Sequence, residues 1–158
     1  GDKLTDEQKQ ALDEVGAIRF TNVATMDEVT AIREAVEALS DQWVAEGREK
    51  VNGIPVKYGQ EESGKRFVQR FAFSSLFSDV IKEFVHDPRF EPVRLLCGDE
   101  CRVGDREKDG VVVNWYRNEV GSKYKALGWH TDGLRDLAYG RLPGPMYNIG
   151  FYFSIFKS

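Results

Sequence analysis

One amphipathic segment constrains the fold of this chain more than any other feature of its sequence. Its apolar residues recur every three or four positions, which is the spacing of one helix face: Val29, Ile32, Val36, Leu39 and Trp43. Thr25 followed by Glu28 is a capping-box pattern at its start, and Gly47 is a typical residue for its end. We therefore predict one long helix between residues 25 and 47, lying flat against a sheet.

Other segments also carry helix signals. Thr5 followed by Gln8 is a second capping-box pattern, and it predicts a helix that ends at Gly16. The apolar side of this helix consists of Leu4, Leu12 and Val15. Two further helices are predicted, one capped by Ser75 and one that starts at Asp87, which a proline follows.

Apolar patterns predict four strands, at residues 17–23, 67–73, 111–116 and 146–153. Residues 48–65 are polar and contain several glycines, so we predict a mobile loop or an irregular hairpin there, which acts as a lid. Helices dominate the first two thirds of the chain and strands follow. This order predicts a mixed α/β (α+β) fold in a single domain over residues 1–158.

Composition excludes several classes of protein. The formal net charge is −4, which argues against nucleic acid as a partner because a phosphate backbone attracts an excess of lysine and arginine. No apolar run approaches the roughly 20 residues that span a membrane, so we expect no membrane association. Cys97 and Cys101 form neither a disulfide framework nor a complete zinc site, which predicts a reducing, cytoplasmic location.

The candidate chemistry lies in the segment Gly128-Trp129-His130-Thr131-Asp132-Gly133. Residues two apart in an extended chain point to the same side, so His130 and Asp132 offer an imidazole nitrogen and a carboxylate oxygen to one metal ion. With a second histidine they would complete the facial two-histidine, one-carboxylate triad that is diagnostic of non-heme Fe(II) oxygenases. We therefore predict that His130 and Asp132 share a metal.

Around this motif the sequence resembles the phytanoyl-CoA dioxygenase family of Fe(II)- and 2-oxoglutarate-dependent oxygenases. The resemblance covers the whole chain, and it is most specific in residues 111–116, 129–132 and 147–154. It implies a double-stranded β-helix (jelly roll, cupin-like) with N-terminal helices packed on the sheet. It also implies oxidation of a small-molecule substrate with 2-oxoglutarate as co-substrate. Asp132 favours hydroxylation, desaturation or ring formation, because halogenating relatives carry a small residue in place of the carboxylate ligand.

The resemblance also assigns roles to residues near the motif. His130 and Asp132 become the first two iron ligands. The positions implied to contact or wall the 2-oxoglutarate are Asn114, Leu127, Trp129, Tyr147, Asn148 and Tyr152. Arg135 and Arg141 follow the motif in a loop rich in glycine and proline, and we expect them on the substrate side.

The family pattern is incomplete after the motif. Only 26 residues follow Asp132, and none of them is the histidine that would complete the triad. An eight-stranded jelly roll does not close in that length, so we expect a truncated, split or degenerate relative that is inactive by itself and self-associates through an open sheet edge. His86 is an alternative third ligand, although the end of an apolar-faced helix more commonly holds a histidine through the helix dipole.

Two other functions stay open. One is a non-catalytic jelly-roll fragment that works as a binding or assembly module, as the missing histidine and arginine suggest. The other is a cupin-like metal hydrolase or isomerase, which would bind metal without consuming 2-oxoglutarate.

Overall fold

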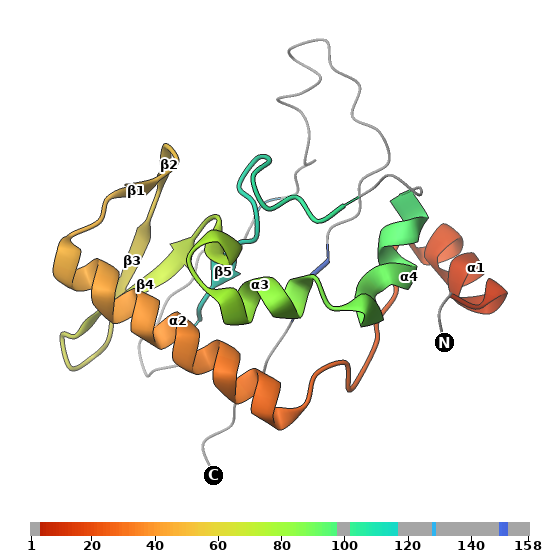
Figure 1. Cartoon of the computed structure of the whole chain (residues 1–158), viewed down its shortest axis with the longest axis horizontal. Helices are drawn as coiled ribbons and strands as arrows, with labels where there is room; N and C mark the ends of the chain where they lie inside the picture. The colour runs from red at the N-terminus through yellow and green to blue at the C-terminus, as the bar shows by residue number, and fades with distance from the viewer. Residues whose placement is uncertain (1–3, 98–101, 117–127, 129–148, 152–158) are drawn as a thin grey trace.

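The computed structural model describes residues 4–97, 102–116, 128 and 149–151. Within them the chain forms helices and small antiparallel sheets, which confirms the α+β class (Figure 1). The helices of four or more residues are α1 (Asp6–Val15), α2 (Met26–Glu46), α3 (Asp79–Val85) and α4 (Glu91–Arg94). The strands are β1 (Lys50–Val51), β2 (Ile54–Pro55), β3 (Lys57–Gln60), β4 (Arg66–Phe71) and β5 (Val113–Asn114). Short 3-10 turns cover Ser74–Leu76, Pro88–Phe90 and Leu95–Cys97.

Both predicted capping boxes are present. The Thr25 hydroxyl accepts a hydrogen bond from the backbone N–H of Glu28, and the Glu28 carboxylate accepts one from the backbone N–H of Thr25. Thr5 and Gln8 make the same reciprocal pair at the start of α1. These contacts satisfy backbone donors that have no partner inside a helix, which is why both helices begin where the sequence predicts.

Helix α2 packs against β4, as its apolar stripe predicts (Figure 1). Trp43 is 1% exposed and meets the ring of Phe71 edge-on, with 5.0 Å between ring centroids. Burial of a side chain of this size stabilises the fold by about 1.5–3 kcal/mol. The hydroxyl of Ser40, also buried, accepts a hydrogen bond of 2.9 Å from the backbone N–H of Val68. Helix and strand are thus joined by both apolar and polar contacts.

Residues 48–65 form the β1–β2 hairpin and the first strand and turn of a second hairpin, β3–β4. The β1–β2 turn contains Asn52 and Gly53, both with positive φ, and such a turn suits a two-residue hairpin. Strand β3 then pairs antiparallel with β4, and the Tyr58 hydroxyl bonds the backbone carbonyls of Trp43 and Arg48 at the end of α2. Burial raises the pKa of this hydroxyl above its usual range. The hairpin alternative is confirmed, and the mobility and lid role stay predictions.

Strand β5 completes a three-stranded sheet in the order β3-β4-β5. Phe71 pairs with Val113 and Arg70 with Asn114. The strand predicted at residues 111–116 is shorter than expected, because the carbonyl of Val111 instead accepts hydrogen bonds from the backbone N–H and the hydroxyl of Ser74.

Two predictions about the helical part are wrong, and a third holds in part. Residues 17–23 form no strand: Asn22 has a positive φ of 58°, Phe20 is 40% exposed, and the described residues supply no strand that pairs with this stretch. The apolar side of α1 is buried in part: Leu4 is 8% exposed and Leu12 is half-buried, whereas Val15 is 75% exposed. Ser75 does not cap a helix; Ser78 caps α3 by accepting from the backbone N–H of Ile81.

The turn at Asp87 agrees with its prediction, because the Asp87 side chain accepts from the backbone N–H of Arg89 as the chain turns. Three aromatic rings, Phe84, Phe90 and Phe151, meet edge-on with centroids 4.9–5.3 Å apart. Of the strand predicted at residues 146–153, residues 149–151 are described, and they adopt no strand. In the described part of the chain, no helix is both long and apolar enough to span a bilayer.

Candidate functional site

Most of the predicted site lies outside the described residues. This holds for the two expected metal ligands, His130 and Asp132, and for Leu127, Trp129, Arg135, Arg141, Tyr147, Asn148 and Tyr152. Among the predicted site residues, the structure places Asn114.

Asn114 lies exposed on β5, at the edge of the three-stranded sheet. Its antiparallel partner on β4 is Arg70, and the partner of Arg70 on β3 is Lys57. Directly opposite residues of antiparallel strands project from the same face with Cβ atoms about 4.5–5.5 Å apart. The sheet therefore carries a polar row of Lys57, Arg70 and Asn114, which we call the cross-strand row.

The cross-strand row faces away from α2. Phe71, the residue after Arg70, packs against Trp43 of α2. Because successive side chains of a strand point to opposite faces, Arg70 projects from the face opposite α2. The register shifts beside this row: Lys57 pairs with Arg70 and Tyr58 with Val68, so Gln69 of β4 is the extra residue of a bulge. Bulges re-aim side chains and are common beside functional sites.

A tight turn before β5 holds one side of the row in place. The Arg70 guanidinium donates a hydrogen bond of 2.7 Å to the carboxylate of Asp109, with the two side chains 25% and 37% exposed. The backbone carbonyl of Asp109 in turn accepts from the N–H of Phe73. The arginine is therefore oriented by a turn that is itself fixed to the end of β4.

A second polar cluster joins Ser75, Asp105 and His86. The Ser75 hydroxyl donates to one carboxylate oxygen of Asp105, and His86 Nε2 lies 2.7 Å from the other. Asp105 is between the serine and the histidine, so the histidine does not contact the serine and cannot activate it as in a hydrolase triad. The contacts instead attach the residue 105–110 turn to α3.

His86 lies at the C-cap of α3, as the helix-terminus interpretation predicts. Its side chain is 42% exposed and contacts the Asp105 carboxylate. A shallow hollow along α3 is lined by Asp79, Lys82, Glu83 and His86. Across the described residues no three His, Cys, Asp or Glu side chains gather closely enough to hold a metal ion.

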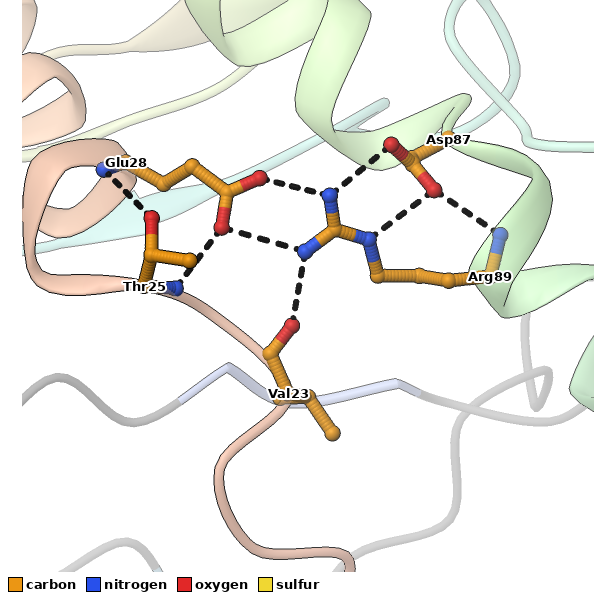
Figure 2. A network of polar contacts seen from close by, with 5 residues as sticks. All are labelled: Val23, Thr25, Glu28, Asp87 and Arg89. Atoms are coloured by element: carbon orange, nitrogen blue, oxygen red, sulfur yellow. Dashed lines mark hydrogen bonds and ion pairs between the residues drawn. The ribbon is translucent and has the colours of Figure 1, made fainter.

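The strongest charge network in the described chain surrounds Arg89 (Figure 2). Its guanidinium forms paired contacts to Glu28, at 2.6 and 3.1 Å, and to Asp87, and it also donates to the backbone carbonyl of Val23. The arginine and the backbone N–H of Thr25 hold the pKa of the Glu28 carboxyl at about 2, and the two carboxylates raise the pKa of Arg89. Because these partners occupy the guanidinium, we interpret the network as a clamp between the start of α2 and the turn after α3.

Sequence reasoning missed Lys57 and Arg70. The available signal was a charged residue inside an otherwise apolar strand, Phe67-Val68-Gln69-Arg70-Phe71. Nothing local indicates which residues lie opposite Arg70, because strand register depends on segments far apart in the sequence.

No model of a known protein family matches this chain, and neither a curated protein nor a solved structure does.

Proposed function

We propose that this chain belongs to an Fe(II)- and 2-oxoglutarate-dependent oxygenase, similar to the phytanoyl-CoA dioxygenases, that oxidises a small molecule. The observation that carries the proposal is the spacing of His130 and Asp132, in a sequence whose other segments follow the order that is typical of the family. An imidazole and a carboxylate on one side of an extended chain are two of the three ligands of the facial triad.

The proposal extends to the fold and the location. The β3-β4-β5 sheet supplies early strands of a jelly roll, with α2 on its outer face and the cross-strand row on the face that becomes interior. Cytoplasmic location is proposed because the two cysteines of the chain form no disulfide framework.

The donor set suits the proposed metal. Neutral imidazole and carboxylate oxygen are ligands that non-heme iron accepts, and His130 and Asp132 would hold it. Bound Fe(II) and 2-oxoglutarate supply the dioxygen-activating chemistry. The protein contributes ligand geometry, orientation of the co-substrate by residues such as Asn114, and exclusion of water by Leu127 and Trp129.

Metal binding tests the proposal directly. We expect the chain to bind Mn(II), measured by electron paramagnetic resonance, and His130→Ala or Asp132→Ala to weaken binding by at least about tenfold. His86→Ala is the matched control and should leave the Mn(II) affinity unchanged. Unchanged affinity in the His130→Ala variant would rule out the proposed metal site, and loss of affinity in the His86→Ala variant would make His86 the third ligand.

A second candidate function is a non-catalytic binding or assembly module. It is favoured by the cross-strand row, a set of polar side chains that the described sheet holds on one face. Iron-dependent release of succinate from 2-oxoglutarate separates the two candidates: we expect none from this chain alone, because two protein ligands hold iron weakly. Succinate production that His130→Ala abolishes would exclude the binding module.

A further inference from the structure

The cross-strand row combines two cations and an amide on the face of the sheet that points away from α2. Lys57 and Asn114 are exposed, and Arg70 is a quarter exposed. The Arg70 side chain contacts Asp109, and among the described residues the side chains of Lys57 and Asn114 make no hydrogen bond or ion pair. A guanidinium has five N–H donors, so most of the donors of Arg70 stay available.

The charges of the row are unbalanced. Lys57 and Arg70 lie directly opposite each other, and like charges in such a pair destabilise a sheet. Asp109 offsets one of the two positive charges, which leaves a net charge of about +1. One bound monoanionic group would offset the remaining charge and relieve this repulsion.

We propose that Lys57, Arg70 and Asn114 form a binding site for the carboxylate group of a small molecule. Arg70 binds carboxylates in the planar, two-point manner of guanidinium groups, Lys57 adds a positive charge, and the Asn114 amide donates a further hydrogen bond. Asp109 keeps the guanidinium oriented from the side opposite the ligand. The single net positive charge favours a carboxylate over a phosphate dianion.

The identity of the ligand rests on the proposed function, whereas the site itself does not. In an oxygenase of this kind, the carboxylate is that of 2-oxoglutarate farthest from the metal, or that of an acidic substrate. Asn114 was already expected from sequence to contact the co-substrate, and Arg70 would then bind the carboxylate of the same molecule.

Isothermal titration of the intact chain tests the site. The probes are glutarate, 2-oxoglutarate and inorganic phosphate, each added without metal. We expect glutarate and 2-oxoglutarate to bind more tightly than phosphate. Arg70→Gln should weaken glutarate binding at least about tenfold, as expected for loss of a charge-assisted pair. Arg102→Gln is the matched control, because Arg102 is also an arginine paired with one carboxylate, that of Glu107, and it is not part of the row.

Two further variants keep the test informative if Arg70→Gln misfolds. Asn114→Ala changes an exposed side chain and should weaken glutarate binding several-fold. Asp109→Asn removes the negative charge that offsets one positive charge of the row, while its amide oxygen can still accept from Arg70, and it should strengthen glutarate binding, a gain that misfolding cannot produce. Equal affinities across the wild type, Asn114→Ala and Asp109→Asn, or tighter binding of phosphate than of glutarate, would overturn the proposed site.

Comparison of the probes and of metal binding separates the two proposals. Glutarate binding that depends on Arg70 in a chain that binds no Mn(II) would support the carboxylate site and overturn the oxygenase. Mn(II) binding that depends on His130, with glutarate affinity unaffected by Arg70→Gln, would support the oxygenase and overturn the carboxylate site. Tighter binding of 2-oxoglutarate than of glutarate once Mn(II) is added assigns the site to the co-substrate, and equal binding assigns it to an acidic substrate.

Discussion

Substitution of Gly110 by alanine should destabilise the turn that leads into β5. Gly110 has a φ of +62°, and a Cβ atom added there would lie 2.5 Å from the backbone oxygen of Asp105 and 2.7 Å from Cδ1 of Phe73. Both neighbours are held in place, because Phe73 is 3% exposed and its N–H bonds the Asp109 carbonyl. The added methyl group therefore forces the backbone of the turn to move.

Two costs add in this variant. An alanine in the left-handed region costs about 1–2 kcal/mol, and a methyl group forced against a packed backbone costs about 1–3 kcal/mol more. A Gly47→Ala variant separates the backbone cost from the steric cost, because the φ of Gly47 is +63° and a Cβ atom there meets nothing within 4 Å. We expect Gly47→Ala to lower the free energy of unfolding by about 1–2 kcal/mol, from the backbone conformation alone.

Urea unfolding followed by circular dichroism measures both variants. The expected result is a midpoint shift for Gly110→Ala clearly larger than that for Gly47→Ala, at an unchanged m value. A Gly110→Ala penalty equal to that of Gly47→Ala would refute the reasoning, because it would mean that the turn accommodates the methyl group without resistance.

Three other outcomes follow from the structure. Ser40→Ala should cost about 1–3 kcal/mol in urea unfolding, because it leaves the buried N–H of Val68 without a partner; a variant as stable as the wild type would show that another acceptor replaces the hydroxyl. Glu28→Gln should lower the free energy of unfolding near pH 7, whereas below about pH 2 the variant and the wild type should unfold alike. A carboxyl with a lowered pKa stabilises the fold above its usual pKa of 4.5 and loses that contribution as the pH falls through about 2. A difference that persisted undiminished at pH 2 would exclude the contacts of Arg89 as its cause. Residues 52–64 should exchange their amide hydrogens faster than α2, and uniformly slow exchange there would contradict the predicted mobility.

Local interactions let the sequence determine the helices. A capping box joins residues three apart, so Thr25 and Glu28 fix the start of α2 wherever the helix lies in the fold. The same holds for the glycines that end α1 and α2 in the left-handed conformation. The apolar stripe of α2 also indicated correctly which face the helix buries, since that stripe has no stable place except against other apolar groups.

Strands depended on the tertiary structure. Residues 17–23 have the alternation of a strand, but a strand forms only beside a partner, and the described structure provides none there. Ser75 has the residue type of a helix cap, and yet a carboxylate 30 positions away binds its hydroxyl.

In the candidate site, too, local relations could be predicted from the sequence, and contacts between distant segments could not. His130 and Asp132 were identified from the sequence because their relation is a spacing of two along the chain, which any extended segment preserves. The cross-strand row was invisible in the sequence, because Lys57, Arg70 and Asn114 become neighbours only through the register of three strands. That register is set by the packing of Phe71 against Trp43 and by the turn at Gly110, which are contacts between segments distant in sequence.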